Sequence, residues 1–401
     1  MSYDIDTVRA DFPALAGGSA HFDGPGGTQT PRRVIDAIAG ALSGPLSNRG
    51  TVTKGESNAE RTVQDARSAI ADLVGGDAGG VVFGRSATQL CYDFSRWISR
   101  DWGAGDEVVV TRLDHDSNVR PWVQAAERTG ATVRWLDFDP QTSELDDVAS
   151  VLSDRTKLVA VTAASNLIGT KPPVAAIAAV AHDAGALVYV DGVHFTAHCS
   201  VDMAALGADF FACSPYKFLG PHLGVLAASP ALLETLHPDK LLPSTNDVPE
   251  RFEFGTLPYE LLAGVAAAVE YLAGLGGGAR ADASRRASLV DAFGRLEAYE
   301  DALLARLEAG IRNLPGVTLH SRAARRTPTL LLTIDGRDTV DAYEFLAARG
   351  VDAPSSNFYA LEASRRLGLG DEGGLRVGLA PYTNDDDVDR LLSGLAAFLA
   401  A

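Results

Sequence analysis

Short apolar runs alternate with alanine-rich amphipathic stretches between about residues 60 and 230. The runs are rich in Val, Leu and Ile, which favour buried strands, and the stretches between them have helical spacing. This alternation is typical of βα units around a mostly parallel sheet. We therefore expect a doubly wound core with strands over Val81–Phe83, Glu107–Thr111, Val133–Leu136, Leu158–Thr162, Leu187–Asp191, Phe210–Ser214 and Gly224–Ala228, and helices over Arg120–Thr129 and Val174–His182.

The pattern changes after Glu260, where longer helical stretches predominate. The triplet Gly276-Gly277-Gly278 and the charged residues that follow it predict an exposed break in the chain. Beyond the break we expect a smaller α/β lobe whose sheet is covered on one side. The predicted elements of this half are helices over Leu261–Leu275, Ala287–Asn313, Val340–Arg349 and Asp385–Leu399, and strands over Thr329–Ile334 and Leu375–Leu379.

Composition excludes several classes of protein. The formal net charge of −17 repels polyanions, so nucleic acid is not an expected partner. The start, MSYDIDTVRADFP, lacks a basic region followed by an apolar one, and no run of about 18 apolar residues could span a bilayer, so we expect a cytoplasmic protein without a membrane partner. Cys91, Cys199 and Cys213 are widely spaced and form no CxxC pair, which predicts neither a disulfide framework nor a zinc site.

Polar residues just past predicted strands are the candidates for function, because ligands of open α/β sheets bind at the carboxyl ends of the strands. Five places stand out in this sequence. They are Ser86-Ala87-Thr88, Asp114-His115, Ser165-Asn166, Asp191 with His194, and Ser214 to Lys217.

Lys217 follows an apolar strand and precedes Phe218-Leu219-Gly220, so its amine is expected to be partly desolvated. Burial lowers the pKa of a lysine and makes the neutral amine available for imine formation, although a surface lysine is the alternative. Asp191 closes the run Leu-Val-Tyr-Val, where a carboxylate either holds a protonated pyridine nitrogen or caps a turn. Asp191, His194 and His198 do not have the spacing of a helical HExxH site, so we expect no metal.

Three further motifs are weaker signals. The imidazole of His115 either stacks on a planar ring or belongs to an ordinary polar loop. The N–H groups of Ser86-Ala87-Thr88 and the Thr88 hydroxyl are suited to a phosphate, although Ser and Thr are also common helix N-caps. The segment Gly24–Thr28 predicts a flexible turn and is neither a dinucleotide-binding nor a Walker A sequence.

Taken together and in order, these residues resemble the class V aminotransferase branch of pyridoxal-phosphate (PLP) enzymes, and within it the cysteine desulfurase-like group. The resemblance spans nearly the whole chain and implies the PLP-dependent transferase fold of type I. Its most specific stretches are YVDGVHFTAH (Tyr189–His198), ADFFACSPYKFLGPHLG (Ala208–Gly224), ASNLIGT (Ala164–Thr170), RFEFGTLPYE (Arg251–Glu260) and RVGLAPYTNDDDVDRL (Arg376–Leu391).

The resemblance implies a role for each site residue. Lys217 carries the cofactor as an imine, Asp191 meets the pyridine nitrogen and His115 stacks on the ring. His194 lies near the phenolic oxygen of the cofactor, and Asn166 near the cofactor and the substrate. The implied phosphate contacts are Ala87, Thr88, Ser214, Tyr216 and, from the second subunit of a homodimer, Thr256; the implied substrate contacts are Gly27, Asn166 and Arg376, whose guanidinium suits a carboxylate.

The resemblance also implies the domain organisation, in agreement with a length of 401 residues that exceeds the usual size of a single core. Residues 1–30 form an N-terminal segment that contributes to the small domain and the active site. Residues 31–275 form the large PLP-binding domain, and residues 276–401 form the small C-terminal domain.

One departure from the family pattern bears on the reaction. Desulfurases of this group carry a mobile-loop cysteine before the arginine strand, and the matching stretch here, Ala353–Ala360, has none. We therefore expect a PLP enzyme acting at Cα or Cβ of an amino acid, by C–S or other β-elimination without a protein persulfide. The alternatives are a class V aminotransferase, a racemase resembling isopenicillin N epimerase, and a non-catalytic binding protein on the same fold.

Overall fold

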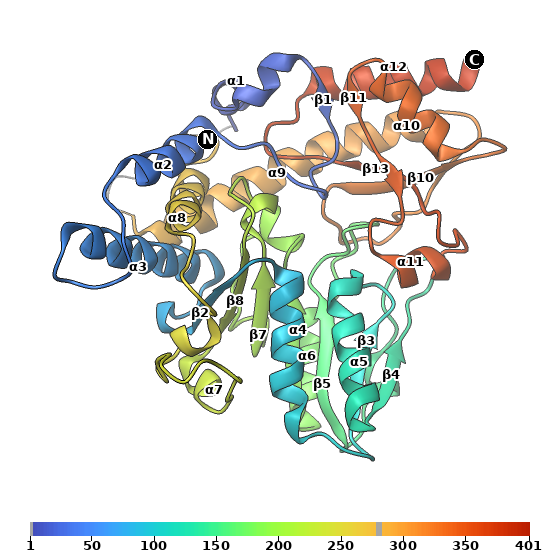
Figure 1. Ribbon diagram of the computed structural model, residues 1–401. Coiled ribbons are helices and arrows are strands. Elements are labelled where there is room, and N and C mark those ends of the chain that lie inside the picture. Colours follow the sequence, from blue (N-terminus) through green and yellow to red (C-terminus); the bar gives the residue numbers. More distant parts are fainter. Residues whose placement is uncertain (1–2, 278–282) are drawn as a thin grey trace.

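The computed structural model describes residues 3–277 and 283–401. A large lobe is built around one sheet, and a smaller lobe contains the elements that follow Arg312 (Figure 1). Of the predicted break, Gly278 lies outside the described residues. Gly276 and Gly277 form a turn in which Gly277 is exposed, whereas Gly276 is buried against the ring of Tyr3, so the expected exposure is wrong for that residue.

The large sheet has seven strands in the order β2-β8-β7-β6-β5-β3-β4. The strands from β7 to β4 run parallel to one another, and β8 is antiparallel to both of its neighbours. The sheet is therefore mostly parallel, as the sequence predicts. Its strands are β2 Val81–Gly84, β3 Glu107–Thr111, β4 Thr132–Leu136, β5 Thr156–Thr162, β6 Leu187–Asp191, β7 Phe210–Cys213 and β8 Gly224–Ala228.

Both faces of this sheet are buried, because alternate residues of each strand belong to different core clusters. In β3, Val109 packs with one cluster and Val108 and Val110 with the other. The first cluster includes side chains from α3 (Lys54–Val74), α6 (Val174–Asp183), α8 (Tyr259–Ala273) and the first half of α9 (Arg285–Arg312). The second includes side chains from α4 (Ala87–Ile98) and α5 (Arg120–Thr129), which confirms the doubly wound architecture.

The small lobe contains an antiparallel sheet in the order β12-β13-β10-β9. In β10, Leu330 and Leu332 pack with the helices of the small lobe, whereas Leu331 packs with Leu113 and Leu167 of the large lobe. Helices thus cover one face, as expected, and the large lobe covers the other. The elements of this lobe are β9 Val317–Leu319, β10 Thr329–Ile334, α10 Thr339–Ala347, β11 Val351–Asp352, β12 Ser355–Ser356, α11 Leu361–Arg366, β13 Gly374–Gly378 and α12 Asp385–Ala400.

The N-terminal segment runs between the lobes. Strand β1 (Ala20–His21) pairs in parallel with β11 of the small lobe, and Asp23 forms a further bridge to Gly378. Helix α9 spans both lobes, since its first half packs in the large core and its second half packs in the small one. The remaining helices are α1 Ile5–Ala10, α2 Arg32–Ser43 and α7 Pro230–Glu234. Among the described residues, no helix is both long and apolar enough to cross a membrane.

Candidate active site

A cavity of about 670 Å³ opens at the carboxyl edge of the parallel strands, where the small lobe meets the large one. Strands β2, β3, β5, β6 and β7 end at this edge, and residues at or just after their ends line the cavity. The predicted site residues that line the cavity are Ala87, Thr88, His115, Asn166, Asp191, His194, Ser214, Tyr216, Lys217 and Arg376.

Lys217 ends the short 3₁₀ turn Pro215–Lys217 that follows β7. Its amine donates to the Pro25 carbonyl and to the Gly26 carbonyl (2.9 Å), and lies 4.8 Å from the centre of the Tyr216 ring. Burial, followed by the charge of Arg376, lowers its pKa to about 7, although nearby carboxylates oppose the shift. Near neutral pH a large share of the amine is therefore the uncharged nucleophile.

Asp191 is the last residue of β6, and its side chain is buried at the floor of the cavity with 7% of its surface exposed. Its Oδ1 accepts a hydrogen bond from the Val193 N–H (2.9 Å). Burial raises the pKa of this carboxyl to about 6, while the Val193 N–H and the charge of Lys217 oppose the rise. At neutral pH most of this carboxyl is therefore ionised, and a cation placed against it stabilises the anion further.

His115 lies in the loop after β3, with its ring in the cavity wall. Its Nδ1 lies 2.8 Å from Ser117 Oγ and accepts from the Ser117 N–H (3.1 Å). Burial, then the charges of Lys217 and Arg376, lower its pKa to about 3. The imidazole is therefore neutral at physiological pH and offers a flat ring rather than a charge.

His194 is held by hydroxyl groups of the small lobe. Its Nε2 lies 2.9 Å from Thr327 Oγ1 and 3.0 Å from Thr329 Oγ1. Its Nδ1 is buried and has no partner among the described residues. Burial lowers the pKa of His194 well below its usual range, so the ring is neutral. One polar nitrogen is thus left without a hydrogen bond in a residue that lines the cavity.

The N-terminus of α4 forms another part of the cavity wall. Ser86 caps the helix by accepting from the Gln89 N–H (3.1 Å), and Ala87 and Thr88 begin its first turn. Strand β8 passes so close that a Cβ at Gly224 would lie 2.1 Å from the Ser86 carbonyl carbon. Free N–H groups at the start of a 12-residue helix favour an anion. On the same wall, Tyr216 stacks on His222 with ring centres 4.8 Å apart.

Arg376 of β13 is almost completely buried, with 2% of its surface exposed. Its Nη2 donates to Asp23 Oδ1 (2.5 Å) and its Nη1 donates to the Asn166 carbonyl (3.1 Å). The ring of Phe358 covers the guanidinium, with its centre 3.6 Å from Cζ. Asn166 also donates through Nδ2 to the Phe358 carbonyl (2.9 Å).

Phe358 and Tyr359 form the outer wall in the segment that has no cysteine. Both residues have positive backbone φ angles, 52° and 58°. Residues other than glycine rarely adopt such angles. The Tyr359 carbonyl accepts from the Asp116 N–H (2.7 Å), and its ring stacks on His115 at 5.5 Å while 74% of the residue is exposed. Such backbone strain is concentrated at functional sites.

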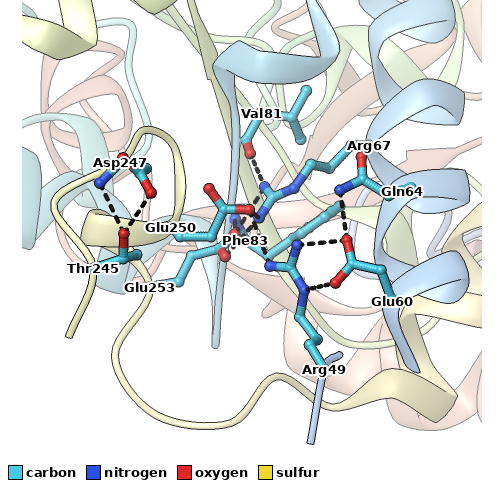
Figure 2. A network of polar contacts seen from close by, with 10 residues as sticks. All are labelled: Arg49, Glu60, Gln64, Arg67, Val81, Phe83, Thr245, Asp247, Glu250 and Glu253. Carbon is cyan, nitrogen blue, oxygen red and sulfur yellow. Dashed lines mark hydrogen bonds and ion pairs between the residues drawn. The ribbon is translucent and has the colours of Figure 1, made fainter. Parts of the chain in front are cut away.

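Two of the residues with an implied role, Gly27 and Thr256, lie outside the lining of this cavity, as do the candidates Asp114 and Ser165. Gly27 lies beside it, and a Cβ there would lie 3.5 Å from the Tyr216 ring. Thr256 is exposed on the segment after Glu253. Figure 2 shows how that segment is anchored: Glu253 pairs with the buried Arg67 (2.8 Å) and accepts from the Phe83 N–H (2.8 Å) of β2.

Sequence reasoning missed several lining residues, among them Asp23, Pro25, Gly26, Asp116 and Arg120. The residues of the segment Gly24–Thr28 alone predict only a turn, although the family resemblance implies a substrate contact at Gly27. The segment does form a turn, with the Gly26 and Gly27 N–H groups on the Asp23 carbonyl, but the Pro25 and Gly26 carbonyls also bind Lys217. The sequence does contain a pattern that indicates a site here, because Asp23 is followed by the small residues of Gly24–Thr28. Small residues let a backbone approach a ligand closely.

The three cysteines are all buried, and none of them belongs to the cavity lining. Burial raises the pKa of each thiol above its ordinary value. His198, considered above as a metal ligand, instead pairs with the buried Glu300 (2.9 Å). Within residues 3–277 and 283–401, no group of three or more His, Cys, Asp or Glu side chains is placed to hold a metal ion.

A buried amine, a buried carboxyl and a neutral histidine at the carboxyl edge of a doubly wound sheet define a class of enzyme that works on amines with a carbonyl cofactor. Comparison with known proteins agrees with this class. The model of the class V aminotransferase family matches residues 20–391. The chain therefore belongs to the class V aminotransferases, a family of PLP-dependent enzymes.

Individual relatives cover nearly the whole chain. It is 34% identical over 406 residues to an uncharacterized protein of Mycobacterium tuberculosis, with 99% of this chain and 100% of that protein covered. It is 30% identical over 417 residues to a cysteine desulfurase of Klebsiella pneumoniae, with 98% of each covered. The solved cysteine desulfurase CsdA of Escherichia coli superposes with a TM-score of 0.87 at 26% identity, covering 100% of this chain and 99% of that one.

The residues present fit PLP. The lining of one cavity supplies an amine of lowered pKa, a carboxyl with one hydrogen bond from the described residues, and an unpartnered imidazole nitrogen. The free N–H groups of α4 provide a place for a phosphate at the same cavity. Each polar part of the cofactor thus has a chemically matched group, in agreement with the family assignment.

Proposed function

We propose that this PLP-dependent enzyme removes a β-substituent from an amino acid, by C–S or a related β-elimination, without forming a persulfide on its own cysteines. One observation carries the proposal. The cavity is lined by the amine of Lys217 and the carboxyl of Asp191, and its lining includes no cysteine. A persulfide-forming enzyme requires a thiolate that reaches the substrate sulfur. Here the segment Ser355–Tyr359 supplies hydroxyl, amide and aromatic side chains instead.

In this proposal Lys217 is the attachment point of the cofactor, and Asp191 pairs with the ring nitrogen. His115 would stack on the ring, His194 would lie near its phenolic oxygen, and Asn166 would contact both the cofactor and the substrate. Ala87 and Thr88 at the N-terminus of α4, together with Ser214 and Tyr216, would hold the phosphate. All of these residues line the same cavity.

When bound, PLP supplies an aldehyde that reacts with amines and a ring that accepts the electron pair of a bond broken at the substrate Cα. Asp191 stabilises the positive charge on the ring nitrogen and so maintains that capacity. Lys217, with a pKa of about 7, can take a proton from carbon and return one to the leaving group at neutral pH. His115 has a pKa of about 3 and is therefore unsuited to act as an acid at that pH.

Arg376 and Asn166 are proposed to hold the substrate carboxylate, with Gly27 leaving room beside Tyr216. Arginine is suited to this role because its planar guanidinium matches a carboxylate with two parallel hydrogen bonds. Both residues already share a hydrogen bond (3.1 Å) and line the cavity. We infer a small amino acid as the substrate.

A homodimer is also part of the proposal, with Thr256 contributing to the partner's phosphate site. Phe254, two residues before Thr256, is 52% exposed, and Leu241 and Leu242 are 71% and 100% exposed. Exposed apolar side chains of this size favour a protein contact. Glu253 pairs with Arg67 of α3 and accepts from the Phe83 N–H of β2 (2.8 Å), and β2 leads directly into the helix that would bind the phosphate. Three free, buried cysteines suit a reducing compartment such as the cytoplasm.

The test is a screen of the cofactor-loaded enzyme against cysteine, S-substituted cysteines and other amino acids. Elimination predicts pyruvate, ammonia and a free thiol or sulfide in equal amounts. Consumption of a keto acid together with an amino donor would instead identify an aminotransferase. Uptake of deuterium at Cα without net loss of the amino acid would identify a racemase, and spectral change without any product would identify a binding protein.

A further inference from the structure

The Arg376 guanidinium already has a carboxylate partner from its own chain. Asp23 Oδ1 accepts from Nη2 at 2.5 Å, and Asp23 precedes the turn that contacts Lys217. Gly26 packs directly on this carboxylate, since a Cβ there would lie 2.1 Å from Asp23 Oδ2. A buried guanidinium without a counter-ion is strongly destabilising. Asp23 therefore supplies the charge that makes burial of Arg376 possible.

The Asp23 contact is a partial one. Arg376 Nε is buried and has no hydrogen-bond partner among the described residues, so Asp23 satisfies the guanidinium through a single nitrogen. A free carboxylate can bind two guanidinium nitrogens in parallel, which is a stronger arrangement. A ligand carboxylate can therefore bind more of the guanidinium nitrogens than Asp23 does.

The surroundings limit how a ligand can approach Arg376. Phe358 covers the face of the guanidinium at 3.6 Å, and the Asn166 carbonyl occupies Nη1. The Asp23 side chain is 42% exposed, whereas that of Arg376 is 2% exposed. The edge that Asp23 occupies is therefore the accessible one, and an incoming carboxylate competes with Asp23 directly.

We propose that Asp23 is a resident carboxylate that occupies the Arg376 subsite between turnovers and is displaced by the α-carboxylate of the amino-acid substrate. Exchange of one carboxylate for another leaves the charge on the arginine balanced throughout. Amines without a carboxylate leave the Asp23 pair intact and gain nothing from Arg376. Asp23 is thus a specificity-determining residue, and this inference rests on the proposed role of Arg376 in binding substrate.

The first test is chemical rescue of Asp23→Ala in the cofactor-loaded protein. The variant leaves a carboxylate-sized space beside Arg376, which added acetate or formate is expected to fill. Its Tm should rise by about 1 to 3 °C in sodium acetate relative to sodium chloride at equal pH and ionic strength. The Tm of the unchanged protein should not distinguish the two salts. An Asp23→Ala protein that responds to acetate no more than the unchanged protein would overturn the proposal.

Matched controls separate the subsite from general salt effects. Asp371→Ala removes the partner of Arg365, an exposed pair at 2.6 Å, and should show no acetate response. Asp23→Ala combined with Arg376→Met should lose the response. Because the measurement needs no turnover, a positive result with no reaction on any amino acid would reject only the proposed elimination.

Asp23→Asn provides a second test that does not depend on the stability of the alanine variant. The measured quantity is the ratio of affinities for L-alanine and ethylamine, which differ by the carboxylate, read from the spectrum of the bound cofactor. Removing the competing charge should raise this ratio roughly fivefold to tenfold. An unchanged or lower ratio would show that Asp23 supports carboxylate binding rather than competing with it.

Discussion

The imidazole of His194, in the large lobe, hydrogen-bonds through Nε2 to the hydroxyl of Thr329 at the start of β10 in the small lobe, at 3.0 Å. Thr327 Oγ1 lies 2.9 Å from the same nitrogen. Because Nδ1 of this ring has no partner among the described residues, the two threonines orient the nitrogen that remains available. The small lobe thus helps to set the geometry of a residue in the cavity wall.

Replacement of both threonines by valine should release the His194 ring. We expect a shift in the absorbance of the bound cofactor and a loss of about 1 kcal/mol of stability for each hydrogen bond removed. Thr333→Val is the matched control, since Thr333 binds His320 in the same way (2.8 Å) but neither residue lines the cavity. An equal spectral effect from both replacements would contradict a specific role for the His194 contact.

The pH dependence of cofactor loading should reveal the lowered pKa of Lys217. Only the neutral amine attacks a carbonyl, so the rate at which apoprotein takes up PLP should rise with pH and level off above the pKa. With a pKa of about 7, the midpoint should lie near neutral pH. Stopped-flow absorbance over pH 5.5 to 10.5 measures it, and a midpoint near 10.5, the ordinary lysine value, would contradict the burial argument.

The three cysteines should be dispensable for turnover. Cys91, Cys199 and Cys213 are buried away from the cavity lining. Their replacement by alanine should therefore leave kcat within about twofold while it lowers stability by roughly 1 kcal/mol at each site. Thiol or sulfide release measured beside Tm separates the two effects. Loss of sulfur release from a folded triple variant would reveal a relay thiol.

Mixed dimers test the proposed role of Thr256. Thr256→Ala is expected to weaken cofactor binding, and Lys217→Ala to abolish turnover. If Thr256 serves the partner's site, mixing the two variants should restore one intact site in each mixed dimer. Activity after subunit exchange should then exceed the sum of the separate variants. Activity equal to that sum, in preparations where exchange is demonstrated, would place Thr256 outside the partner's site.

The sequence predicted the core strands well because buried strands have a strong local signal. The bounds of β3, β6 and β8 match the predicted ranges, and β7 ends one residue earlier, at Cys213. The direction of β8 was not predictable, since an apolar run has the same pattern in either orientation. The structure pairs it antiparallel with both β2 and β7.

The site was predictable where a polar residue follows a strand, as at Asp191 and Lys217. Asp23 and Phe358 were missed because neither follows a strand of the large sheet. Asp23 lies near the start of the chain and Phe358 lies in the small lobe, yet both line the cavity. Their contacts with Arg376 depend on how the two lobes meet. Short local patterns contain no information about that tertiary arrangement.

The central claim is that the Lys217 amine is the attachment point of the cofactor. The most direct measurement is reduction of the PLP-loaded protein with borohydride, followed by digestion and mass spectrometry. The expected result is a phosphopyridoxyl group on the peptide that contains Lys217, and no covalent label in Lys217→Ala. A label on a different lysine, or a Lys217→Ala protein that is still labelled to the same extent, would contradict this account of the site.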